Sequence, residues 1–171
     1  MNSDLFAQGL IAGPSTEEIL AGRDTEEFRA LIGNEKARQL FDYWLRLLRA
    51  RGLAMKHDFD PIEVPSLLPN IYIEEWDPEE RQSRMRLMGE GLKAQWDEDV
   101  VGLRTDDYVS GNVNSLWKRS DQVVYFDRRA AVLAYDMEYQ DRPHCTLVDL
   151  ALPMEDRHGN KFAIGYIWQN D

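Results

Sequence analysis

Cysteine and histidine are scarce in this sequence, and their scarcity excludes several kinds of site. Cys145 is the only cysteine, so an intramolecular disulfide and a cysteine-based zinc site of the usual spacing are both excluded. The three histidines, His57, His144 and His158, are scattered along the chain without a common ligand spacing. We therefore predict no metal site, and the sequence requires no cofactor.

Basic charge and long apolar runs are also lacking. The 31 acidic residues outnumber the 20 basic ones and give a net charge of −11, which argues against a phosphate backbone or an anionic lipid surface as a partner. No apolar run approaches the length that crosses a bilayer. Residues 1–14 have no basic segment before their short apolar patch, as a signal peptide would have. The sequence predicts a cytoplasmic protein that binds neither nucleic acid nor membrane.

Hydrophobic residues make up 43% of the 171 residues, which is enough for one domain with a proper core plus an extension. We assign residues 1–33 to a partly loose, N-terminal helical extension and residues 34–171 to the domain. Residues 1–13 lack periodicity. Helix starts follow at Ser15, where Glu18 completes a capping box, and at Asp24.

The clearest helix is predicted after Asn34, a suitable N-cap. Apolar residues then recur at helical spacing, at Ala37, Leu40, Phe41, Trp44 and Leu48. A second apolar side is formed by Tyr43, Leu45 and Leu47. A helix that is apolar on two sides covers two surfaces. One surface is its own domain, and we predict that the other is a second copy of the chain in a homodimer.

Residues 59–76 organise the rest of the chain. Pro61, Pro65 and Pro69 cannot lie inside a helix, because each removes a backbone donor and clashes one turn back. This stretch therefore predicts a fixed connector that leads into a strand over residues 71–76, which are rich in β-branched and aromatic residues.

The remaining residues predict a strand, several short helices and three more strands. Alternation over 83–88 predicts a hairpin with the strand before it. Short helices are predicted near 92–96 and 106–109, and an amphipathic helix runs from Asn112 to about Phe126. Period-two alternation then predicts strands over 132–139, 145–152 and 162–168, with a turn at 141–143.

This order of elements resembles that of a PAS domain, and the chain is similar to a stand-alone PAS-like family of alphaproteobacteria. The matching segments are 40–44 (LFDYW), 60–69, 85–89 (MRLMG), 99–102 (DVVG), 152–154 (LPM) and 165–167 (GYI). The resemblance implies an α+β fold: a five-stranded antiparallel sheet with short helices on one face, plus the N-terminal extension. It also implies small-molecule binding between sheet and helices, dimerisation through flanking helices, and signal relay to a kinase or another regulator. It carries over no catalytic residue.

Two sets of residues are candidates for binding. A pocket for a small apolar or aromatic ligand would be lined by Trp96, Trp117, Tyr135, Met137, Val148, Leu150 and Tyr166. The alternative is that these residues only form the core, since regular apolar stripes are what any core needs. The surface for a dimer or another partner would use Leu20, Phe28, Leu31, Phe41 and Trp44.

The preferred function is a non-catalytic PAS-type sensory or regulatory module. It would bind a small molecule or a signalling protein, as a homodimer, and its output would pass through a partner. One alternative is a small cone-shaped α+β enzyme with Asp136, Asp149 or His144 as acid–base groups. The other is a pure dimerisation scaffold. A dry, filled core would favour the scaffold, an apolar cavity the sensor, and a cavity with a buried carboxylate the enzyme.

Overall fold

A computed structural model describes residues 9–137 and 144–170 of the chain. Within these ranges six strands form one antiparallel sheet in the order β1-β4-β5-β6-β2-β3. The strands are β1 Leu10–Ser15, β2 Ile71–Asp77, β3 Gln82–Met88, β4 Arg129–Met137, β5 Cys145–Glu155 and β6 Lys161–Asn170. The helices are α1 Thr16–Leu20, α2 Glu26–Leu31, α3 Glu35–Arg51, α4 Glu90–Trp96, α5 Thr105–Tyr108 and α6 Gly111–Asp121. Four further helical turns are η2 Lys56–Asp58, η3 Pro61–Glu63, η4 Pro65–Asn70 and η5 Gln122–Phe126.

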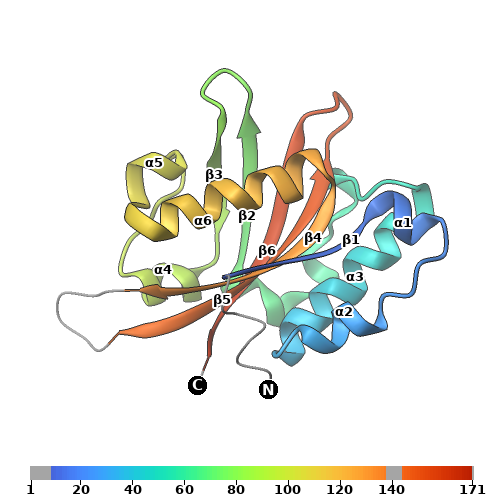
Figure 1. Cartoon of the computed structure of the whole chain (residues 1–171), viewed down its shortest axis with the longest axis horizontal. Coiled ribbons are helices and arrows are strands. Elements are labelled where there is room, and N and C mark those ends of the chain that lie inside the picture. The colour runs from blue at the N-terminus through green and yellow to red at the C-terminus, as the bar shows by residue number, and fades with distance from the viewer. Residues whose placement is uncertain (1–8, 138–143, 171) are drawn as a thin grey trace.

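Helices α1, α2 and α3 cover one face of the sheet (Figure 1). The capping box forms as the sequence predicts: Glu18 N donates to Ser15 Oγ over 3.1 Å, and Ser15 N donates to the Glu18 carboxylate over 2.8 Å. Asn34 caps α3. The helix then buries its apolar stripe against the sheet, where Trp44 Nε1 donates to the carbonyl of Pro153 over 2.9 Å. Ile19, Phe28 and Ile32, which precede α3 in the chain, belong to the same core.

The second apolar side of α3 is covered by the chain's own connector. Tyr43 packs edge-on against Phe59, with 5.8 Å between ring centroids, and its hydroxyl accepts a hydrogen bond from Asp60 N over 2.9 Å. The three prolines hold this connector in 3₁₀ turns η3 and η4, which pass over the helix before β2 begins. The two-sided pattern of α3 therefore has an explanation within one chain and is not an argument for a dimer.

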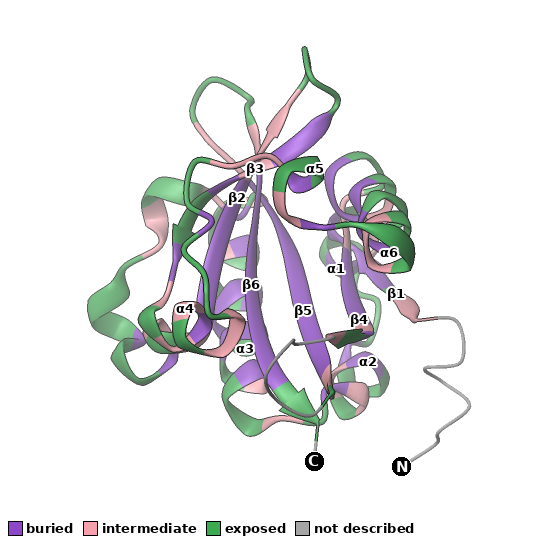
Figure 2. Ribbon diagram, turned by 90° about the vertical axis from the view of Figure 1, so that its left-hand side faces the viewer, coloured by how far each residue is buried: buried purple, intermediate pink, exposed green. Residues whose placement is uncertain are grey.

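Helices α4, α5, α6 and η5 cover the opposite face of the sheet. Strands β5 and β6 are buried along most of their length between the two helical layers (Figure 2). The predicted helix to Phe126 is present, but its last five residues form a π-helical turn, η5. Such turns place one extra residue in the helix and are frequent at functional sites.

The PAS-like α+β fold is confirmed, with two differences from the expected one. The sheet has a sixth strand, because Leu10–Ser15 pairs with β4 instead of remaining irregular. Helices cover both faces of the sheet and not only one. The expected turn at 141–143 and the end of the strand predicted over 132–139 lie outside the described residues. Within the described ranges, every helix is too short or too polar to cross a bilayer.

Candidate functional site

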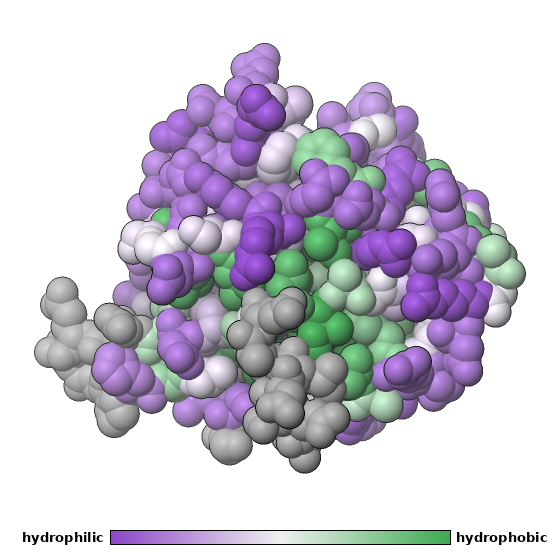
Figure 3. Space-filling view, viewed as in Figure 1, coloured by the Kyte–Doolittle hydropathy of each residue, from purple (hydrophilic) through white to green (hydrophobic). Residues whose placement is uncertain are grey.

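An aromatic cleft lies between α4, α5, α6 and β4. Its walls include four aromatic rings in contact with one another. The ring centroid of Trp96 lies 5.9 Å from that of Tyr108 and 5.7 Å from that of Trp117, and the centroids of Trp117 and Tyr135 are 5.8 Å apart. As bounded by the described residues, the cleft has a volume of about 700 Å³ and is partly open. Hydrophobic side chains gather below α6 on the face that Figure 3 shows. Glu98, Arg119 and Asp136 bring charge to the cleft lining.

Two polar groups in the walls have no acceptor. The Nε1 atoms of Trp96 and Trp117 are buried, and neither has a hydrogen-bond partner among the described residues. Trp117 is only 6% exposed. A buried donor without an acceptor costs about 1–3 kcal/mol, so these two indole groups suit a ligand that supplies acceptors.

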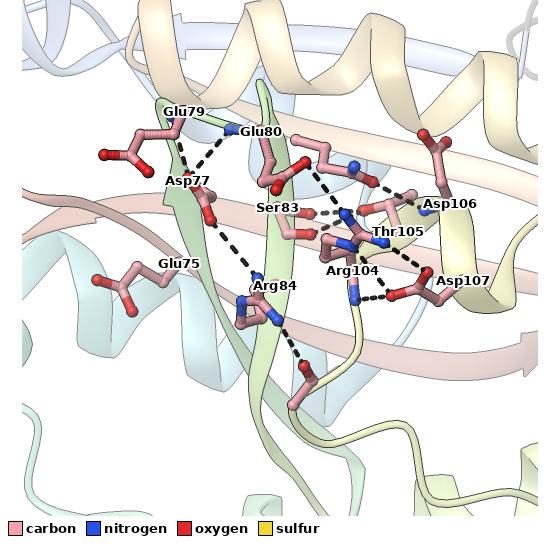
Figure 4. Close-up of polar contacts among 12 residues, drawn as sticks. Glu75, Asp77, Glu79, Glu80, Ser83, Arg84, Arg104, Thr105, Asp106 and Asp107 are labelled. Carbon is pink, nitrogen blue, oxygen red and sulfur yellow. Dashed lines mark hydrogen bonds and ion pairs between the residues drawn. The ribbon is translucent and has the colours of Figure 1, made fainter.

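Helix α5, which carries Tyr108, is fixed to the β2–β3 hairpin by an ionic clamp (Figure 4). Arg104 lies between Glu80 and Asp107, at 3.0 and 3.2 Å. Its hydrogen bond to Asp107 lowers the pKa of that carboxyl. Under the clamp, the hydroxyls of Ser83 and Thr105 are buried and 2.8 Å apart. The clamp therefore holds one wall of the cleft on the end of the sheet.

A small polar cavity lies behind the cleft, in the core between the sheet and α6–η5. It has a volume of about 10 Å³, close to the room that one water molecule needs. Its polar lining consists of Tyr72, Glu74, Ser120, Asp121, Tyr125 and Asp149. The Tyr72 hydroxyl donates to Asp149 over 2.8 Å. The hydroxyls of Tyr108 and Tyr125 face the two oxygens of Glu74 at 3.2 and 3.3 Å.

The three carboxyl groups of this cavity resist ionisation. Burial raises the pKa of Glu74 to about 7, although the tyrosine hydroxyls that donate to it act in the opposite direction. Burial, and then the charge of Glu74, raise the pKa of Asp121 to about 8. Burial also raises the pKa of Asp149 well above its usual range. A charged carboxylate loses its hydration in such a place, so the neutral form is favoured.

Two of these carboxyl groups lie on strand faces that are otherwise mostly apolar. Glu74 shares a strand face with Tyr72, two residues before it. Asp149 stands between Leu147 and Ala151 on the same face of β5. The signal in the sequence was a single aspartate inside the run 147–154 of β5, whose other residues are all apolar.

The predicted pocket residues divide between the two faces of the sheet. Trp96, Trp117, Tyr135 and Met137 line the aromatic cleft. The other three, Val148, Leu150 and Tyr166, face the N-terminal layer and belong to the core around α3. Alternate residues of a strand point to opposite faces, and the cleft side of β5 is lined by Leu147, Asp149 and Ala151 instead. The predicted pocket was therefore wrong for these three residues.

The predicted partner surface is mostly inside the chain. Phe28, Phe41 and Trp44 are buried against the sheet, which removes them from any outer surface. Leu31 is half-buried and Leu20 is 46% exposed. The large apolar side chains that are exposed in the described residues are Leu20, Leu53, Ile62, Leu87, Val101 and Phe126.

The acid–base groups of the enzyme alternative do not meet. Asp149 is 3% exposed and lines the polar cavity. Asp136 is exposed and accepts a hydrogen bond from Thr146 at the far end of the β4–β5 pair, and His144 is exposed just before β5. Neither lines the cavity. In the described part of the chain, no three His, Cys, Asp or Glu side chains are placed so that they could hold a metal ion together.

Comparisons with known proteins find one family and several solved structures that the chain resembles. A family described as "PAS domain" matches residues 33–167. Among solved structures, the PAS domain of BvgS from Bordetella pertussis has a TM-score of 0.46 and 16% identity, over 64% of this chain and 82% of that one. A fungal LOV domain photoreceptor has a TM-score of 0.46 and 12% identity, over 82% of this chain and 99% of that one. A search of curated protein sequences finds no match. The family match spans most of the chain and shows that the protein belongs to the PAS domain family.

Proposed function

We propose that this PAS domain is a sensory module that binds a small, flat ligand in the aromatic cleft and passes the signal to a partner protein. PAS domains are in general sensory and regulatory modules without catalytic activity. The observation that carries the proposal is the cleft itself, in which two buried indole N–H groups have no acceptor among the described residues. A planar ligand with acceptor atoms would stack on the aromatic walls, and a rotation of either indole ring would bring its buried N–H to the ligand.

The aromatic cleft also favours a sensor over the scaffold and the enzyme. A scaffold needs no open cleft with unpaired donors in its walls. The polar cavity with its buried carboxyl groups is the feature that we expected of an enzyme, but at about 10 Å³ it has room for roughly one water molecule and none for a substrate. Of the three acid–base candidates only Asp149 lines it, whereas Asp136 and His144 lie elsewhere. We propose that the signal passes to a second copy of the chain in a homodimer or to a signalling protein such as a kinase. In either case the contact uses exposed side chains such as Leu20, since Phe41 and Trp44 are buried.

The test compares two half-buried tryptophans of the same domain. Trp96→Ala opens the cleft wall, whereas Trp76→Ala removes a tryptophan that packs on Tyr125 and Phe126 away from the cleft. Each full-length protein is titrated with the planar probe 8-anilinonaphthalene-1-sulfonate, and the remaining tryptophan fluorescence is recorded. We expect Trp96→Ala to weaken binding at least about tenfold, which is the loss of one stacking contact of roughly 1.4 kcal/mol. Trp76→Ala should bind like the unaltered protein.

Native mass spectrometry of the purified protein is the second measurement. Extra mass that survives gentle conditions and leaves on denaturation would reveal a natural ligand, and the same spectrum reports monomer or dimer. Equal probe binding by both variants, together with a clean apo dimer, would favour the scaffold. Equal probe binding by both variants, together with a monomer that carries no extra mass, would refute both ligand binding in the cleft and the homodimer.

A further inference from the structure

The core of this domain contains three buried carboxyl groups that lie close together. Glu74 on β2, Asp121 on α6 and Asp149 on β5 are 6%, 8% and 3% exposed, and all three line one cavity of about 10 Å³. A packed core can be built without carboxyl groups, and each buried carboxylate without a counter-ion is costly. The lining residues of this cavity include no lysine, arginine or histidine.

The groups around the cluster explain why it holds protons. Hydroxyl groups face it from β2 (Tyr72), α5 (Tyr108) and η5 (Tyr125), and burial raises the pKa of each of these tyrosines above its usual value. Other neighbours are Ser83 on β3, Leu133 and Tyr135 on β4, and Ala163 on β6. The arginines of β3 point elsewhere: Arg84 pairs with Asp77 and Arg86 with Glu75. Lys118 favours ionised Asp121 only weakly, because it is half exposed and pairs with Asp106 over 2.8 Å.

We propose that Glu74, Asp121 and Asp149 form a proton-binding cluster whose ionisation loosens the α5–α6–η5 layer from the sheet. Neutral carboxyl groups let α6 pack on β2, with Tyr108 and Tyr125 bonded to Glu74. Successive loss of protons places like charges in one water-poor cavity, where they repel strongly. Because Asp121 lies on α6 and Glu74 on the sheet, this repulsion acts directly between the two layers.

The geometry converts this repulsion into movement of a defined segment. Asp121 is the last residue of α6, directly before the π-helical turn that positions Tyr125. A helix that leaves the sheet at Asp121 therefore also withdraws Tyr125 from Glu74. The N-terminal layer on the other face carries none of these groups and should stay in place.

The sign of the pH dependence follows from the raised pKa values. An unfolded chain releases the Glu74 proton near its ordinary pKa of 4.5, whereas the folded chain keeps it until about pH 7, and the Asp121 proton until about pH 8. The stabilisation is therefore complete below pH 4.5 for the Glu74 proton and below pH 3.8, the ordinary pKa of Asp121, for the other. It is lost as the pH rises through 7 and 8.

Hydrogen exchange measured by mass spectrometry tests the proposal on the full chain. We expect the protection factors of residues 105–126, corrected for intrinsic exchange, to fall at least about tenfold between pH 6 and pH 8.5. Each proton that is released on opening changes the opening equilibrium about tenfold per pH unit. Residues 35–51 should stay constant. Glu74→Gln and Asp121→Asn should each flatten the dependence. Glu79→Gln, an exposed carboxylate on the β2–β3 turn, should leave it unchanged.

Three results would overturn the proposal: constant protection of residues 105–126 in the unaltered protein, an equal fall in residues 35–51, or an unchanged dependence in both variants. If the variants do not fold, infrared spectroscopy of the unaltered protein decides. A carbonyl band of buried, protonated carboxylic acid should be present at pH 6 and lose intensity by pH 9, as Glu74 and Asp121 release their protons. Its absence at pH 6 would refute the cluster.

Discussion

Gly165→Ala should displace the Tyr72 ring and break the hydrogen bond of its hydroxyl to Asp149 in the polar cavity. Gly165 on β6 is the direct cross-strand partner of Tyr72 on β2. A Cβ at this position would lie 2.1 Å from Cζ and 2.3 Å from the hydroxyl oxygen of Tyr72. The ring cannot yield easily, since it is fully buried and its hydroxyl is bonded to Asp149 over 2.8 Å. Overpacking costs about 1–3 kcal/mol and the lost hydrogen bond about 1 kcal/mol more, so we expect a loss of about 3 kcal/mol.

Urea unfolding at pH 7, followed by circular dichroism, measures this loss as a shift of the midpoint at constant slope. Gly33→Ala is the matched control, because a Cβ at Gly33 meets nothing within 4 Å. It should change stability by less than about 0.5 kcal/mol. In a Tyr72→Val background, Gly165→Ala should cost nothing or stabilise the strand, because the clashing ring is absent. An equal loss in both backgrounds would show that the clash with Tyr72 is not the cause.

Three further substitutions test other parts of the structure. Gly89→Ala should cost more than Gly165→Ala in the same urea assay, since its Cβ would lie 2.2 Å from the backbone carbonyl of Leu68, which no side-chain rotation can move. Trp44→Phe should lower the free energy of unfolding by about 1–2 kcal/mol in thermal unfolding, because the Pro153 carbonyl loses its donor; no change would mean that water replaces the indole. Glu18→Gln should destabilise the protein at pH 7. Hydrogen bonding in the capping box and from Arg129 lowers the pKa of Glu18 to about 2, so this difference is full above pH 4.5 and should vanish as the pH falls to 2, as acid titration of the two proteins will show.

Local patterns predicted most elements of this fold. The spacing of Leu40, Phe41 and Trp44 predicted α3, and Ser15 with Glu18 predicted the start of α1, because both signals depend only on near neighbours. Strand β1 was missed, since a short segment with Gly13 and Pro14 resembles a loop until β4 is beside it. The face of each central strand was also not predictable. In β5 both Val148 and Leu147 are buried, so an apolar run does not tell which layer each residue meets.

The carboxyl cluster depends on topology, which no local pattern contains. Glu74, Asp121 and Asp149 come from three distant parts of the chain and meet only because β2 and β5 flank β6 while α6 crosses over them. Each taken alone is an ordinary acidic residue. The aromatic cleft brings together Trp96, Trp117, Tyr135 and Met137 of the predicted pocket, whereas the other three residues face the other layer; ligand binding in the cleft stays a prediction.

The two outer strands of the sheet limit how another protein can attach. On one side, β3 already exchanges backbone hydrogen bonds with a loop, from Met85 N to Leu103 O and from Gly102 N to Met85 O. On the other side, β1 carries Pro14 and a break in register between Ala12 and Ser15. Prolines, irregular pairing and covering loops are the features that stop edge-to-edge extension of sheets. A peptide that had to join the sheet as a seventh strand would therefore meet no straight, open edge among the described residues, and a partner would have to be recognised by its fit to side chains instead.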